Sequence, residues 1–114
     1  KPVPAYVMVY EISGPMFFGA ADKIPHMERD NGCRVLILRM RSVPAMDITA
    51  LNGLRRLYDE CVRKNINVVF SHVNEQPMSV FRKSGMYDLV GAENFQPNID
   101  VALERAISIG GMPV

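Results

Sequence analysis

The chain alternates between short apolar runs and amphipathic stretches. Two nearly continuous apolar runs, at residues 33–40 and 66–71, indicate strands that are buried on both faces. Residues 6–13 are rich in β-branched and aromatic side chains and predict another strand. Two short strands are predicted at residues 16–18, hairpinned onto the first strand, and at residues 94–95. The pattern therefore predicts four or five strands.

The clearest helical spacing begins directly after Asp47 and ends at Lys64–Asn65. Its apolar positions are Ile48, Leu51, Leu54, Tyr58, Cys61 and Val62. A weaker helix is predicted over residues 19–30, where Pro25 would break or kink the interior. The first of these helices joins the two most apolar strands.

Two further helices follow the last apolar run. Pro77 is predicted to be the first helical residue of one, with Asn74 and Glu75 as possible caps and Gly85 just past its end. Pro97 is predicted to open the last helix, whose apolar positions continue to residue 107. Strands and helices thus alternate along the whole chain.

This alternation predicts an α/β fold. We expect one domain with a four- to five-stranded, mostly parallel or mixed sheet and about four helices. A length of 114 residues suits a single domain. Its predicted limits are residues 6–108, after a linker-like lead at residues 1–5 and before a frayed tail at residues 109–114. The lead has no initiator methionine, so we expect the domain to be part of a longer polypeptide.

Composition excludes several classes of function. The net charge is +1, from 13 basic and 12 acidic residues spread along the chain, which argues against a nucleic-acid partner. No apolar run is long enough to span a membrane. Cys33 and Cys61 have no metal-type spacing and are predicted to be buried thiols in a reducing compartment, although one disulfide stays open. No motif predicts a cofactor or a metal ion.

The segment Asp47-Ile48-Thr49-Ala50 is the main candidate site, and three interpretations compete. Asp47 can cap the following helix by accepting from the N–H of Thr49 or Ala50. It could instead act as a nucleophile or base, but no second carboxylate, His or Lys lies in the motif. Thr49 could be a phosphoacceptor, because the N–H groups and dipole of a first helical turn favour a phosphate.

Two histidines are weaker candidates for a catalytic or metal-binding site. Ser71–His72 follows a predicted strand and should lie near Asp47, but no GxSxG elbow supports a hydrolase. His26 stands alone beside Pro25 and is expected at the surface. Catalysis and metal binding are therefore not predicted.

Other residues are candidates for contacts with a partner or an anion. Met16, Phe17 and Phe18 form a short apolar patch that could lie near the Asp47 loop, and Met46 belongs to that loop. Arg41 could act as a counter-charge for an anion or nucleotide at the start of the helix. Since no glycine-rich phosphate loop is present, such binding should be weak.

At this point the chain resembles the STAS domain, a family shared by sulfate transporters and anti-sigma-factor antagonists. The resemblance covers nearly all of residues 6–106. It rests on the order and spacing of GPMFFGAAD, VLILRMRSVPAMDITALNGL, NVVFSHV, FRKSGM with LVG, and NFQPNIDVALERA. The first of these motifs is similar to the version found in the branch of SulP-type anion carriers. In that branch the domain follows the last transmembrane helix.

The resemblance implies a non-enzymatic regulatory or protein-interaction domain on the cytoplasmic face of the bacterial inner membrane. Its implied partners are the transmembrane portion of its own transporter, and further a cytosolic protein or a nucleotide. The antagonist branch usually carries Asp-Ser-Ser-Gly, where the second Ser is phosphorylated. Here Thr49 keeps the hydroxyl and Ala50 replaces the Gly. The alternatives are a stand-alone antagonist switched at Thr49 and a weak nucleotide- or anion-binding module.

Overall fold

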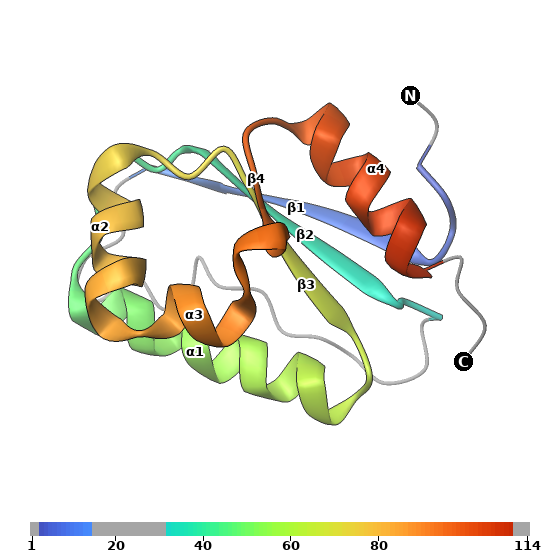
Figure 1. Cartoon of the computed structure of the whole chain (residues 1–114), viewed down its shortest axis with the longest axis horizontal. Coiled ribbons are helices and arrows are strands. Elements are labelled where there is room, and N and C mark those ends of the chain that lie inside the picture. Colours follow the sequence, from blue (N-terminus) through green and yellow to red (C-terminus); the bar gives the residue numbers. More distant parts are fainter. Residues whose placement is uncertain (1–2, 15–31, 111–114) are drawn as a thin grey trace.

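The computed structural model describes residues 3–14 and 32–110, and a parallel sheet lies at its centre (Figure 1). Its strands, in spatial order, are β1 (Val7–Ser13), β2 (Val35–Ser42), β3 (Asn67–Ser71) and β4 (Phe95–Gln96). Each neighbouring pair of these strands is parallel. Parallel neighbours need crossover connections, so the α/β fold predicted from the alternating pattern is confirmed.

The central strand β2 is buried on both faces. Leu36 and Leu38 face one core, while Val35 and Ile37 face the other, and all four are at most 1% exposed. Successive side chains of a strand point to opposite faces, so two cores require apolar residues at every position. This double burial explains why residues 35–38 form a continuous apolar run.

Three helices cover the first core (Figure 1). They are α1 (Ile48–Arg63), α2 (Glu75–Ser84) and α3 (Met86–Val90). Their buried side chains include Leu54 of α1 and Phe81 of α2, each with no exposed surface. Phe95 of β4 packs against this core and stacks on Phe70 of β3, with ring centroids 5.1 Å apart. Aromatic packing therefore holds the short strand β4 in place.

The fourth helix, α4 (Ile99–Gly110), covers the opposite face of the sheet. Ala102, Leu103 and Ala106 pack against Val35 and other apolar residues of that second core. Small residues at two of these helix positions allow the helix to approach the strands closely. The sheet therefore lies between one helix and a layer of three.

Several boundaries differ from the sequence prediction. Asn74 is the N-cap of α2, so Pro77 is its third helical residue, although its missing N–H still falls in the first turn. α3 and the 3₁₀ turn Ala92–Asn94 were not predicted, because such short segments show no helical spacing. α4 continues through Gly110, so the predicted tail starts two residues too early. The predicted strand at residues 16–18 and helix at residues 19–30 lie outside the described residues.

The end of α4 packs against the start of β1. Gly110 is buried, and a Cβ at this position would overlap the edge of the Tyr6 ring. Arg34, just before β2, donates from Nη1 to the carbonyl oxygen of Gly110 at 3.0 Å. This charged donor satisfies a carbonyl that the helix itself leaves without a partner. Glycine is therefore required by close packing at this end of the helix.

We expect Gly110→Val to lower the free energy of unfolding by about 1–3 kcal/mol, because the added side chain overlaps Tyr6. Ser108→Val is the matched control, since Ser108 is exposed on the same helix. Urea unfolding followed by circular dichroism measures both variants. Equal stability of the two would contradict the close approach of Gly110 to Tyr6.

Candidate switch loop and helix cap

The switch loop comprises residues 43–47, which connect β2 to α1. Asp47 is the N-cap of α1 and accepts a hydrogen bond from the N–H of Ala50 at 2.9 Å. Its φ of −103° and ψ of 177° are the extended values expected of a cap residue. The predicted cap is therefore confirmed, with Ala50 as the donor.

The residues after the cap differ in exposure. Ile48 is 56% exposed and Thr49 is also exposed, whereas Ala50 is buried. Thr49 lies in the first turn of α1, where backbone N–H groups lack intrahelical partners. A phosphate on Thr49 would therefore meet a favourable helix dipole, but also the carboxylate of Asp47.

Two apolar side chains anchor the switch loop in the core. Val43 is fully buried, and Met46 is 1% exposed. Both belong to the core that α1 covers. Met46 was predicted to be a partner contact, and this is wrong, because its side chain points inward and packs against the sheet.

Gln76, in the first turn of α2, holds the backbone of the switch loop. The N–H of Met46 donates to Oε1 of Gln76 at 2.8 Å, and Nε2 of Gln76 donates to the carbonyl oxygen of Met46 at 3.1 Å. One side-chain amide thus pairs with both polar backbone groups of one loop residue. The two hydrogen bonds fix the distance between the switch loop and α2.

Asn74 adds a second connection to the same loop. Its Nδ2 donates to the carbonyl oxygen of Val43 at 2.9 Å and to that of Arg41 at 3.1 Å. Although Asn74 is the N-cap residue of α2, its side chain makes no capping hydrogen bond. We refer to Asn74 and Gln76 together as the amide clamp.

Sequence reasoning identified Asn74 only as a cap and did not identify Gln76. The clamp joins residues about 30 positions apart, and no local spacing signals such a contact. The only hint is a pair of amide side chains directly after a buried strand. In a parallel sheet that position lies at the same edge as the switch loop.

Arg41, the proposed counter-charge for an anion, pairs with a carboxylate on the neighbouring strand. Its Nε donates to Oε2 of Glu11 on β1 at 3.2 Å, and Arg39 also lies 3.8 Å from that carboxylate. The hydrogen bond from Arg41 lowers the pKa of Glu11. The pair therefore stabilises the fold above the ordinary pKa of the carboxyl, and this contribution is lost as the pH falls through the lowered value. Arg41 is thus engaged by Glu11.

The Ser71–His72 pair lacks an accessible nucleophile. Ser71 is fully buried, and its Oγ has no hydrogen-bond partner among the described residues. His72 is exposed and adopts a left-handed φ of 54°. Because the hydroxyl is sealed from solvent, the geometry does not support attack by Ser71 on a substrate.

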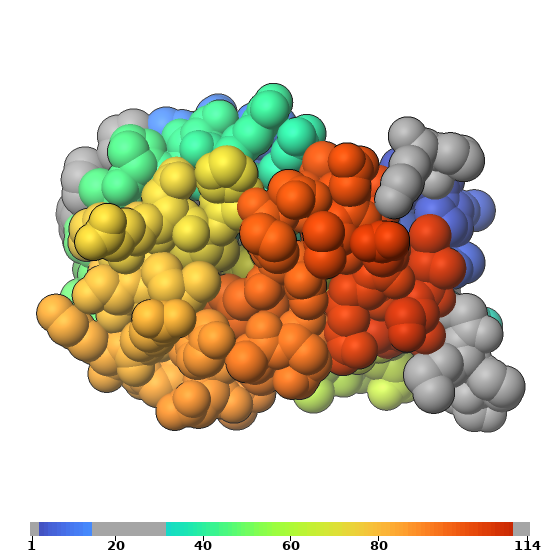
Figure 2. All heavy atoms as spheres, turned by 45° about the horizontal axis from the view of Figure 1, so that its top comes forward, coloured from blue at the N-terminus to red at the C-terminus, as the bar shows by residue number. Residues whose placement is uncertain are grey.

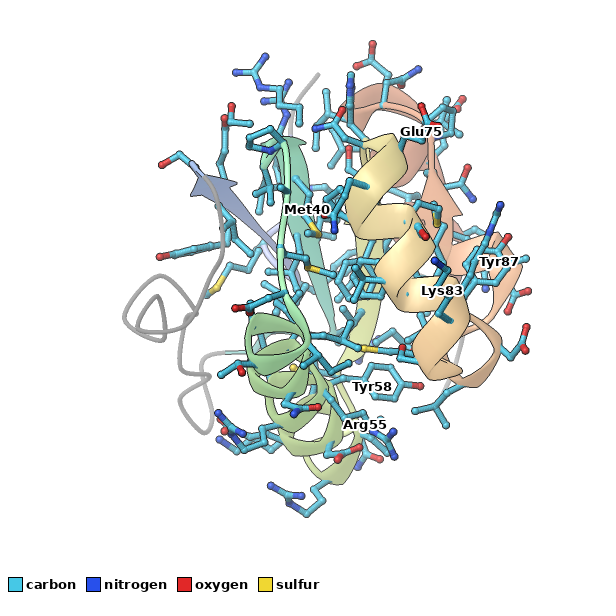
Figure 3. All side chains as sticks on the ribbon, turned by 90° about the vertical axis from the view of Figure 1, so that its left-hand side faces the viewer. Met40, Arg55, Tyr58, Glu75, Lys83 and Tyr87 are labelled. Atoms are coloured by element: carbon cyan, nitrogen blue, oxygen red, sulfur yellow. The ribbon has the colours of Figure 1, made fainter. Side chains whose placement is uncertain are left out.

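Two open pockets lie at the start of α2. One, of about 650 Å³, is lined by Pro44, Asn74, Glu75, Gln76 and Ser79. The other, of about 480 Å³, lies between the start of α2 and the segment that joins β4 to α4, and both segments meet on the surface in Figure 2. Figure 3 places Glu75 at this end of α2. Both pockets are rimmed by an exposed carboxylate, which disfavours anions.

Metal sites, membrane-spanning helices and reactive thiols are three further features that could indicate a function in the described part of the chain. Residues 3–14 and 32–110 contain no group of three His, Cys, Asp or Glu side chains that could hold a metal ion. Across the same ranges, no helix is long and apolar enough to cross a membrane. Cys61 is buried and Cys33 half-buried, and neither forms a disulfide within the described residues. Burial raises the pKa of both, that of Cys61 to about 12.

The fold and the loop define a single α/β domain in which a loop anchored in the core leads into a helix capped by Asp47. The STAS domain family matches residues 1–102, so the chain belongs to the STAS domain family. The recognition of this family from the sequence motifs is confirmed.

Two solved structures of bacterial proteins have the same fold. A sulfate transporter family protein from Wolinella succinogenes is 32% identical, with a TM-score of 0.88, over 98% of this chain and 93% of that chain. The STAS domain of a SulP transporter from Vibrio cholerae is 31% identical, with a TM-score of 0.78, over 94% and 85% of the two chains. The chain is thus similar to STAS domains of transporters.

A longer relative is the Bacillus subtilis protein named "Putative sulfate transporter YvdB". It is 29% identical over 94 residues, which are 78% of this chain and 17% of that protein. The chain therefore spans less than a fifth of the length of this curated relative.

We expect Asp47→Ala to lower the free energy of unfolding by about 1 kcal/mol, because the N–H of Ala50 loses its acceptor. Asp47→Asn is the matched control, since an amide oxygen also caps helices well. Urea unfolding of both variants measures the difference. A stable Asp47→Ala variant would show that the cap contributes little.

We expect Gln76→Ala to destabilise the protein by about 1–3 kcal/mol, because two hydrogen bonds to Met46 are lost. Hydrogen exchange of the Met46 amide should accelerate at the same time. Glu75→Ala, one residue earlier on the same turn, is the control and should leave that amide protected. Unchanged exchange in Gln76→Ala would argue against the amide clamp.

Proposed function

We propose that this chain is the cytoplasmic regulatory domain of a SulP-type anion transporter and acts through contacts rather than catalysis. The observation that carries the proposal is the similarity of nearly the whole chain to STAS domains of sulfate transporters. The domain would lie on the cytoplasmic face of the bacterial inner membrane. Its partner would be the transmembrane portion of its own transporter or a cytosolic protein.

The contact face would consist of the switch loop and the first turn of α1, and the exposed side of α1 as far as Lys64 would extend it if a protein also covers the rest of that helix. Pro44, Ile48 and Thr49 are its exposed residues near the cap. Because the amide clamp and two buried side chains already fix the loop, binding would require little further ordering. Met16, Phe17 and Phe18 remain proposed contacts and lie outside the described residues.

A second candidate is a stand-alone antagonist of an anti-sigma factor, switched by phosphorylation at Thr49. The observation that favours it is the exposed hydroxyl in the first turn of α1. In either protein a phosphate on Thr49 would add negative charge beside Asp47 and change which partner fits.

Nucleotide or anion binding is the weakest candidate. The carboxylate of Asp47 lies at the start of α1 and repels an anion there, while Arg41 is engaged by Glu11. No observation favours a nucleotide over other anions at this position.

The first test asks which polypeptide contains the domain. Native cells are separated into membrane and soluble fractions, and both are blotted with an antibody raised against this domain. We expect a large band in the membrane fraction. A soluble band of the size of this 114-residue chain would overturn the transporter proposal and favour the antagonist.

The second test asks whether the contact face regulates transport. In the full-length protein, Thr49→Glu should change the rate of anion uptake several-fold, because a charge is added beside Asp47. Asn52→Asp adds the same charge to an exposed position one turn further along α1, and should change uptake less. Equal uptake by the wild type and Thr49→Glu would count against regulation through this turn.

A further inference from the structure

The outward face of α1 has two large apolar side chains that are exposed to solvent. Ile48 is 56% exposed and Val62 is 53% exposed, the highest values among the large apolar side chains of the described residues. The two lie about four turns apart, on the same side of the helix. Burying both would remove apolar surface that the described fold leaves in water.

The same face is rich in arginine. Arg55, Arg56 and Arg63 are exposed, and Figure 3 shows Arg55 on the outer side of α1. Arg55 pairs with Asp59 at 3.3 Å. For Arg56 and Arg63, residues 3–14 and 32–110 provide no ion pair. Two guanidinium groups thus remain available to an anionic partner, between two exposed apolar side chains.

The charge of this face suits an anionic membrane surface. The two pockets at the start of α2 include no residue of α1. A helix with arginines beside apolar residues suits the boundary between lipid headgroups and acyl chains.

We propose that the outward face of α1 binds anionic phospholipid headgroups of the membrane to which the domain is attached. Arg56 and Arg63 contact phosphate groups, and Ile48 and Val62 lie at the level of the first acyl carbons. The inference rests on the proposed function, because attachment to a membrane protein keeps the helix close to the bilayer. A weak intrinsic affinity is sufficient under such tethering.

The test uses the 114-residue chain and sedimenting vesicles. One set contains equal parts phosphatidylglycerol and phosphatidylcholine, and the other contains phosphatidylcholine alone. We expect binding to the first set only, and release as the salt concentration rises. Binding to both sets alike, or to neither, would overturn the proposal.

Variants distinguish binding through this face from a general effect of net charge. Arg56→Gln with Arg63→Gln should weaken binding about 25-fold, which is about fivefold for each arginine. Arg34→Gln with Arg105→Gln is the matched control, because it removes the same charge from the side covered by α4. An equal loss in both double variants would show that only net charge matters, and would overturn the proposal. Ile48→Ser with Val62→Ser should also weaken binding, without changing the release by salt.

A cross-linking experiment identifies the occupant in the full-length protein. A photoreactive residue at position 52, on the outward face of α1, should form adducts with lipid. An adduct with a polypeptide would show that a protein covers this face instead, and would contradict the proposal. Neither result alters the fractionation and transport tests, so the proposed function can stand if lipid binding fails.

Discussion

Double-sided burial of the two central strands is the constraint on which the rest of the structure depends. The strands β2 and β3 contact helices on both faces, they pair in parallel, and α1 makes the crossover between them. The crossovers bring the starts of α1 and α2 to the carboxyl edge of the sheet. The switch loop and the first turn of α2 therefore meet, although about 30 residues separate them in the chain.

At that edge, two side-chain amides make the hydrogen bonds to the backbone of the switch loop that water would otherwise make. Gln76 satisfies both backbone groups of Met46, and Asn74 satisfies the carbonyl oxygens of Val43 and Arg41. The cost falls on α2, whose N-cap residue makes no side-chain capping bond. The gain is a loop of fixed shape that presents Asp47 in the extended conformation a cap requires. The N-cap residue of α2 therefore uses its side chain for a long-range contact with the switch loop instead of a capping hydrogen bond.

Sequence patterns predicted the parts of this structure that depend on local periodicity. The apolar runs of β2 and β3, the spacing of α1 and the cap at Asp47 all follow from short-range rules. Three features could not be predicted, because each depends on a distant partner. These are the clamp at Gln76, the pairing of Arg41 with Glu11 and the burial of Met46. The family resemblance implied a STAS domain but none of these contacts.

The electrostatics of α1 connect the cap with the outward face. Phosphate on Thr49 would bring about 1.5–2 negative charges to the first turn. That is comparable with the two positive charges of Arg56 and Arg63. Arg56 lies about 10 Å along the helix from Thr49, close to the screening length at physiological salt, so the arginine would feel part of the added charge. Phosphorylation would then weaken the attraction of α1 for anionic headgroups without moving a strand. A charge change at the cap would therefore act on the nearer part of the helix face, so a rigid loop and a regulatory role are compatible.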